Sequence, residues 1–156
     1  MIGSLFAFLL AAAAAPPSPT APLDFLVGHC WAGKPKPTQT DRHCFRRGKD
    51  GSIFDHHELT ETGKPTITGD TRYRWDPALK AIRYTYRDSR GGVLSSLVKR
   101  NGNTIDFGTA PYRTPDGTTY VITTRWTVFG PTSYQSEMTS PSFPMMKRTT
   151  RFERVS

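Results

Sequence analysis

The sequence predicts an all-β protein, an antiparallel up-and-down meander of about ten strands that closes into a barrel. From Cys30 onward, apolar and β-branched residues alternate with polar ones, as in strands with one buried and one solvated face. Turn residues recur about every ten positions, and no stretch after residue 28 has sustained helical periodicity. A closed barrel is favoured over the alternative, a β-sandwich, because closure removes edge strands.

Strand candidates are the segments between successive turn signals. Their approximate ranges are 30–35, 39–47, 52–60, 66–76, 80–88, 92–100, 103–109, 118–129, 132–139 and 146–155. The clearest of them have apolar faces rich in tyrosine and tryptophan. Five such residues are our candidates for lining a ligand cavity: Tyr73, Trp75, Tyr84, Tyr86 and Trp126. Tyr and Trp carry a polar group that needs a partner when buried, which suits a partly polar cavity, whereas ordinary core packing is the simpler alternative.

The beginning of the chain differs in composition from the rest. Residues 1–15 are apolar or small, and we interpret them as a secretory signal peptide, followed by a Pro-rich spacer over 16–22. Residues 23–156 form a single domain of ordinary size, with one short helical turn expected over 22–27. The alternative for the beginning of the chain is a disordered Ala/Pro-rich tail. We therefore expect a periplasmic or secreted protein.

The cysteines support the same compartment. There are two, Cys30 and Cys44, and an even number in an exported chain favours a disulfide. A hairpin that turns around residues 36–37 places the two cysteines directly opposite each other, close enough to bridge. We predict a structural disulfide that contributes about 3 kcal/mol in the chain-entropy account.

Four histidines fall in a narrow part of the sequence: His29, His43, His56 and His57. His29 and His43 each precede a cysteine, but their spacing matches no zinc motif. His56 and His57 are adjacent in a strand and must point to opposite faces, each with an acidic residue on its own face. An acid-assisted imidazole can therefore form on either face. We predict no metal site, cofactor or catalytic residue, and leave open whether any histidine is functional.

The opening of the predicted domain, Leu23-Asp24-Phe25-Leu26-Val27-Gly28-His29-Cys30-Trp31-Ala32-Gly33, resembles the start of calycin-type barrels. It is similar to the nitrobindin-like and lipocalin-like barrels and their uncharacterised exported bacterial relatives, although two residues rather than one separate Gly28 from Trp31. The resemblance implies a barrel around a ligand cavity. In nitrobindin-like proteins a histidine near the end of the chain binds the haem iron. Here no histidine follows His57, so haem binding does not carry over.

The chain is basic, with a formal net charge of +8, but its basic residues are scattered along the strands. They suit solvated outer faces or contact with an anionic surface. Basic and aromatic residues interleave over 72–75 and 83–87, where alternation puts them on opposite faces. Binding of single-stranded nucleic acid needs both kinds on one face, so we expect no nucleic-acid partner.

Three functions remain after these steps. The leading hypothesis is an exported barrel that binds a small apolar or amphipathic molecule in its interior, as a monomer or homodimer. The alternative is an envelope-associated module that binds anionic lipid or polysaccharide through a basic surface. The third is a barrel enzyme of cyclase or isomerase type, although the sequence favours a non-enzymatic role because it lacks nucleophile and phosphate-binding motifs.

Overall fold

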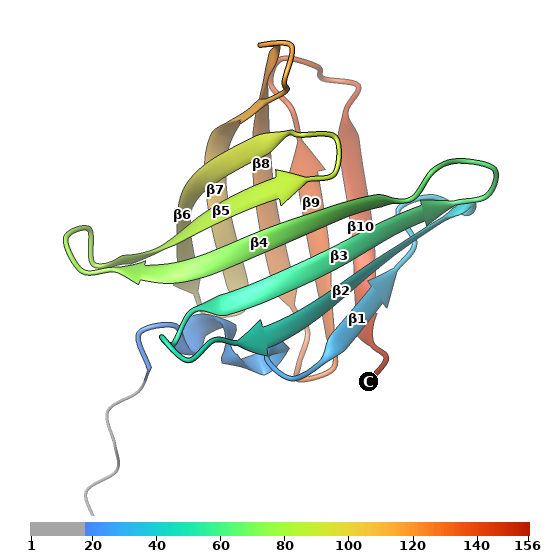
Figure 1. Cartoon of the computed structure of the whole chain (residues 1–156). Coiled ribbons are helices and arrows are strands. Elements are labelled where there is room, and N and C mark those ends of the chain that lie inside the picture. The colour runs from blue at the N-terminus through green and yellow to red at the C-terminus, as the bar shows by residue number, and fades with distance from the viewer. Residues whose placement is uncertain (1–17) are drawn as a thin grey trace, which may run out of the picture.

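The computed structural model describes residues 18–156 and contains one closed antiparallel barrel (Figure 1). A short 3-10 helix, η1, spans Ala21–Leu26. The strands are β1 (Cys30–Gly33), β2 (Gln39–Arg47), β3 (Ile53–Glu61), β4 (Ile67–Asp76), β5 (Ala81–Asp88), β6 (Val93–Asn101), β7 (Thr104–Arg113), β8 (Thr119–Val128), β9 (Ser133–Thr139) and β10 (Lys147–Arg154). The predicted signal peptide, 1–15, lies outside the described residues.

Each strand pairs with its neighbours in sequence, and β1 pairs with β10 to close the sheet. The predicted meander of ten strands is therefore confirmed, and the alternative of a β-sandwich is wrong. Closure agrees with a calycin-like barrel. Among the described residues, no helix is long and apolar enough to cross a bilayer.

One strand is longer than the sequence predicts. β7 continues to Arg113, four residues past the predicted end at 109. The pairing of β7 with β8 shifts between Asp106 and Thr109, where Gly108 has a φ of +69° and donates its N–H to the Asp106 carboxylate. A bulge of this kind absorbs an extra residue and lets the strand continue in a new register. The bulge interrupts the alternation of apolar and polar residues, which is why the predicted strand ended at residue 109.

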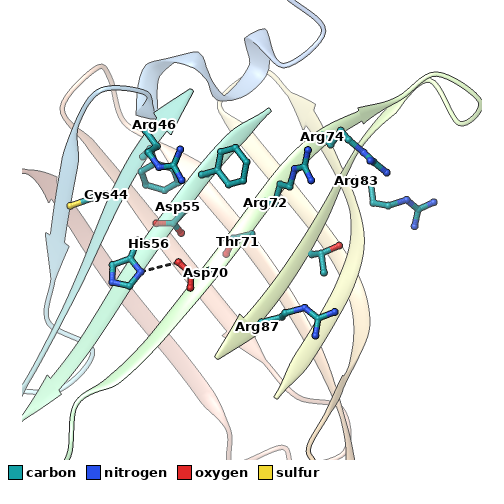
Figure 2. A pocket seen from close by; sticks show the side chains of 13 residues that line it. Cys44, Arg46, Asp55, His56, Asp70, Thr71, Arg72, Arg74, Arg83 and Arg87 are labelled. Carbon is teal, nitrogen blue, oxygen red and sulfur yellow. Dashed lines mark hydrogen bonds and ion pairs between the residues drawn. The ribbon is translucent and has the colours of Figure 1, made fainter. Parts of the chain in front are cut away.

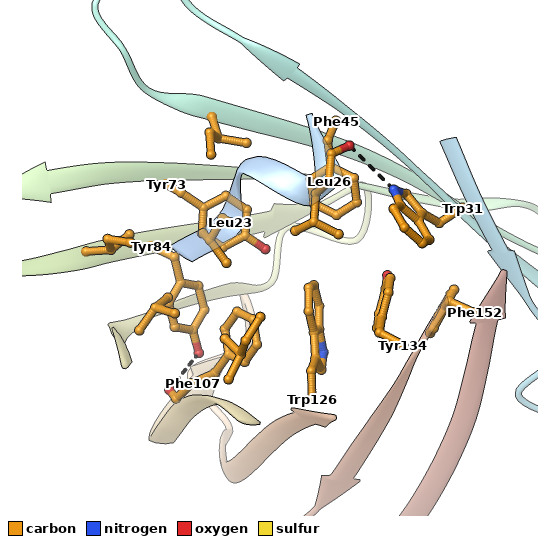
Figure 3. Packing of buried hydrophobic residues seen from close by; sticks show 14 residues of the cluster. Leu23, Leu26, Trp31, Phe45, Tyr73, Tyr84, Phe107, Trp126, Tyr134 and Phe152 are labelled. Atoms are coloured by element: carbon orange, nitrogen blue, oxygen red, sulfur yellow. Dashed lines mark hydrogen bonds between the residues drawn. The ribbon is translucent and has the colours of Figure 1, made fainter. Parts of the chain in front are cut away.

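The η1 helix closes one end of the barrel. Its residues Leu23 and Leu26 are completely buried, because residues three apart share one face of a 3-10 helix. Figure 3 shows both leucines directed at the aromatic side chains of the barrel core. Arg100 donates to the carbonyl oxygen of Pro22 over 2.6 Å, and Arg47 pairs with Asp24. The helix therefore acts as a plug, tied to the strands by both apolar and polar contacts.

Candidate functional site in the barrel interior

The barrel interior contains a cavity of about 420 Å³, which lies toward the end opposite η1. This volume is within the range of roughly 300–1,000 Å³ found for small-molecule sites. Its wall combines aromatic, aliphatic and charged side chains. Members of the wall toward the open end include Leu59, Ile67, Asp88, Arg90, Leu94, Tyr112, Met138, Met146 and Arg148.

Aromatic rings form the floor of this cavity. Phe107 and Trp126 have ring centroids 4.5 Å apart, and Trp126 stacks on Tyr134 at the same separation. Tyr84 donates its hydroxyl to the carbonyl oxygen of Phe107 over 3.3 Å, so its polar group is satisfied below the cavity. Figure 3 shows these rings gathered beside Leu23 and Leu26 of the plug. The floor is therefore mostly apolar.

Four of the five aromatic residues singled out in the sequence lie in the cavity wall: Tyr73, Tyr84, Tyr86 and Trp126. The fifth, Trp75, is partly buried and packs against the core without lining the cavity. All five share the inward face, as alternation requires. Alternation does not report how far along the barrel axis a residue lies, which is why Trp75 could not be separated from the others.

A cluster of two aspartates and two histidines lies on the wall formed by β2 and β3; we call it the Asp–His cluster and define it as Asp41, His43, Asp55 and His57. His43 lies directly opposite His57 in the strand register, and their rings stack with centroids 4.9 Å apart. His43 Nδ1 is 2.8 Å from Asp55 Oδ2, and His43 Nε2 is 3.4 Å from Asp41 Oδ1. His57 Nδ1 is 3.1 Å from the same Asp41 oxygen. These four residues therefore form one connected polar group. Within it, one ring nitrogen of His43, one ring nitrogen of His57 and one carboxylate oxygen of Asp41 all lie within 4.8 Å of one another.

The carboxylates control the charge of this cluster. Burial disfavours the charged form of His43, but the charge of Asp55 and hydrogen bonds to Asp41 and Asp55 outweigh it and raise the His43 pKa to about 10. Burial likewise opposes ionisation of Asp41, yet hydrogen bonds from His43 and His57 hold the Asp41 pKa well below its ordinary value. At neutral pH the cluster therefore contains a buried imidazolium beside an ionised aspartate.

Two tyrosines extend the polar wall toward the open end. The Tyr86 hydroxyl is 3.0 Å from His57 Nε2, and Tyr112 donates its hydroxyl to Asp88 over 2.6 Å. Burial raises the pKa of both phenols, with that of Tyr112 reaching about 12 beside the Asp88 carboxylate. Both therefore remain neutral hydrogen-bonding groups at physiological pH.

A glycine makes room for the contact between His57 and Tyr86. Gly69 lies opposite His57 in the register of β3 and β4. A Cβ atom at this position would lie 2.3 Å from His57 Nε2 and 2.5 Å from the Tyr86 ring. Any larger residue at position 69 would push the imidazole away from the phenol, so the glycine is part of the site.

Two buried oxygen atoms in the wall have no hydrogen-bond partner among the described residues. They are Asp55 Oδ1 and Thr150 Oγ1. Buried polar atoms are nearly always paired with protein, water or a ligand. The wall thus offers hydrogen-bonding capacity to whatever fills the cavity.

The remaining two histidines face outward. His56 pairs with Asp70 and Glu58 on the outer surface, and His29 contacts the backbone carbonyl of Ser156. The position of His43 and His29 beside the two cysteines did not reveal the pairing of His43 with His57. The signal was present, because the turn over residues 48–51 places positions 43 and 57 opposite each other, as the turn over 36–37 does for the cysteines.

The outer surface of β2–β5 carries a second feature, a hollow of about 590 Å³ surrounded by arginines. We call it the arginine face and define it as Arg46, Arg72, Arg74, Arg83 and Arg87 (Figure 2). Arg46 and Arg72 both lie over the ring of Phe54, at 4.5 and 5.4 Å from its centroid. Arg74 and Arg83 are direct cross-strand neighbours, a like-charge pairing that opposes folding unless counter-charges are near.

The chain matches no protein-family model, and no curated protein is significantly similar to it.

Proposed function

We propose that the protein binds a small amphipathic molecule inside the barrel. The observation that carries this proposal is the cavity of about 420 Å³ with an aromatic floor and a charged wall. Pockets that hold small molecules combine a mostly apolar lining with a few placed polar groups. The apolar part of the ligand would rest on Phe107 and Trp126, and its polar group would face the Asp–His cluster.

The surroundings of the cavity support an amphipathic ligand. The loop between β9 and β10 exposes three apolar side chains, Phe143, Met145 and Met146. Met146 also lines the cavity, so this loop connects solvent with the interior. An apolar rim favours capture of ligands that are poorly soluble in water.

We further propose that the protein acts outside the cytoplasm. The disulfide joins Cys30 and Cys44 with an S–S distance of 2.06 Å, as predicted. Disulfides persist in oxidising compartments such as the periplasm. The apolar stretch over 1–15, and the resemblance to the exported bacterial relatives of nitrobindin-like barrels, support the same location.

The test is native mass spectrometry of oxidised protein from a periplasmic host, followed by titration of tryptophan fluorescence with fatty acids and retinoids. We expect a stoichiometric bound mass that persists at high salt. Thr124 lines the cavity, whereas its neighbour Thr123 pairs with Thr109 on the outer face. Thr124→Phe should weaken binding at least about tenfold by filling the cavity, and Thr123→Phe should leave it unchanged.

Two outcomes would contradict the proposal. One is a bare mass together with no fluorescence response to any ligand of the panel. The other is equal loss of binding in the two phenylalanine variants, which would locate the ligand outside the barrel.

The arginine face favours a second candidate function, contact with anionic lipid or polysaccharide of the cell envelope. In the part of the chain that the structure describes, Arg46, Arg74 and Arg87 form no ion pair with a carboxylate. Unpaired guanidinium groups around a hollow can bind phosphate or carboxylate groups in a bidentate manner. This candidate uses the outer wall and is compatible with a ligand in the interior.

A cyclase or isomerase would use the Asp–His cluster for proton transfer. Buried imidazole and carboxyl groups with shifted pKa values are typical of such sites. A candidate substrate that exchanges a carbon-bound hydrogen with deuterated solvent only in the presence of the protein would distinguish this enzyme from a binding protein.

A further inference from the structure

We propose that Asp41, His43 and His57 bind a divalent transition-metal ion of the zinc type. The spacing of residues along the chain predicts no metal site, because it contains no zinc motif. The site instead forms across two strands, where β2 supplies Asp41 and His43 and β3 supplies His57. This proposal does not depend on the binding of an organic ligand, because metal binding can be measured alone.

The spacing of the ligand atoms fits a small tetrahedral ion. Asp41 Oδ1 is 3.1 Å from His57 Nδ1 and 3.4 Å from His43 Nε2. Zinc bonds to nitrogen and oxygen of about 2.0–2.1 Å place neighbouring tetrahedral ligands roughly 3.3 Å apart. The two ligand nitrogens lie within 4.8 Å of each other on stacked rings, so both imidazoles must turn toward each other to bind one ion.

The outer contacts orient both imidazoles so that one ring nitrogen of each faces the site, and metal binding displaces the second proton of His43. His43 Nδ1 is 2.8 Å from Asp55 Oδ2, so a proton on Nδ1 leaves the lone pair of Nε2 directed at the site. His57 Nε2 is 3.0 Å from the Tyr86 hydroxyl, which leaves Nδ1 for the metal. Metal-binding histidines typically donate their second ring nitrogen to a carboxylate or another fixed acceptor. Asp55 and Tyr86 are therefore positioning residues for the two ligands.

The donor set and its position select the ion. Two imidazole nitrogens and one carboxylate oxygen suit zinc and similar ions, whereas calcium and magnesium prefer oxygen ligands. All three side chains are mostly buried and line the cavity. Three protein ligands leave one tetrahedral position, which faces the cavity and can accept water or a polar group of a ligand.

The experiment titrates untagged, chelator-treated protein with Zn²⁺ by calorimetry and with Co²⁺ by visible absorption. We expect one ion per chain and the strong visible bands of four-coordinate Co²⁺. His57→Gln and Asp41→Asn remove a ligand and should abolish stoichiometric binding. Asp55→Asn and Tyr86→Phe keep all three ligands and should weaken binding about 10–100-fold.

The matched control is His56→Gln, which removes the adjacent histidine on the outer face. It should bind Zn²⁺ as tightly as the wild-type protein. Zn²⁺ should also raise the denaturation midpoint of the wild type and of His56→Gln, but not of His57→Gln. If His57→Gln does not fold, the graded loss in Tyr86→Phe decides. Absence of stoichiometric binding by the wild type, or equal loss in His56→Gln, would overturn the proposal.

Discussion

His43 and Cys44 are adjacent in β2 and point to opposite sides of the barrel wall. Cys44 reaches across to Cys30 on the outside, while His43 faces the cavity between Asp41 and Asp55. The disulfide thereby holds β1 against β2 at the height of the Asp–His cluster. The covalent link and the proposed site are supported by the same short segment of chain.

The charge of His43 predicts how stability depends on pH in metal-free protein. Its pKa is raised from 6.5 to about 10 in the folded state, so its contribution is complete below pH 6.5 and declines as pH rises toward 10. The free energy of unfolding should fall between pH 7 and pH 9.5, by up to about 1.4 kcal/mol per pH unit. Urea denaturation with a chelator present, at a series of pH values, measures this slope.

The His43→Gln variant is the control for this slope, because it removes the titrating group while keeping a polar side chain. Its free energy of unfolding should be nearly constant over the same range. An equal alkaline slope in the wild type and in His43→Gln would show that the titrating group lies elsewhere.

Asp41 affects stability at acid pH. Its pKa is lowered in the folded state, so its contribution to stability is present above its ordinary pKa of 3.8 and is lost at lower pH.

At the scale of elements, η1 determines which end of the barrel is filled. Leu23 and Leu26 enter the core from a helix of only six residues, and Trp31 donates its indole N–H to the carbonyl oxygen of Leu26 over 3.4 Å. The plug closes the floor beneath the aromatic rings (Figure 3). The cavity is consequently restricted to the opposite end.

Truncating a buried side chain of the plug should destabilise the barrel. Leu26→Ala removes a fully buried side chain, and such a change costs about 2–5 kcal/mol because it leaves a cavity. Leu79→Ala is the matched control, since Leu79 is 51% exposed in the loop between β4 and β5. It should change stability by less than about 0.5 kcal/mol. Chemical denaturation of the three proteins measures the difference, and equal midpoints would contradict the role of the plug.

At the scale of the whole molecule, the barrel wall separates two chemically different surfaces. The inner surface carries the cavity and the Asp–His cluster, and the outer surface of β2–β5 carries the arginine face (Figure 2). The basic residues that give the chain its net charge of +8 are scattered along the sequence. The antiparallel register brings Arg74 beside Arg83, and Arg87 beside Asp70.

The arginine face should bind anionic surfaces in a salt-dependent manner. Changing Arg74, Arg83 and Arg87 to serine should abolish co-sedimentation with vesicles rich in anionic lipid, or retention on an anionic polysaccharide. The control changes Lys99, Arg113 and Arg125 on β6–β8, which removes equal charge from another part of the barrel. Binding of the wild type should weaken steeply with ionic strength. Equal loss in both triple variants would indicate a response to net charge alone.

The alternation of apolar and polar residues was enough to predict most of the fold and part of the candidate site. Alternation identified all ten strands and the inward direction of Tyr73, Tyr84 and Trp126. The bulge at Gly108 and the position of Trp75 away from the cavity were missed. Both depend on contacts between strands, which a pattern within one strand does not report.

The strands, their two faces and the pairing of Cys30 with Cys44 follow from the order of residues alone, because side-chain direction has a period of two residues and a tight hairpin defines its own register. The three-dimensional arrangement was needed to exclude the sandwich in favour of the predicted barrel, to place η1 at one end, and to bring His43 and His57 together on Asp41. It also gathered scattered arginines on one outer face. The physical reason is that neighbours across a barrel depend on closure and register along every strand, which are set by the packing of the whole core.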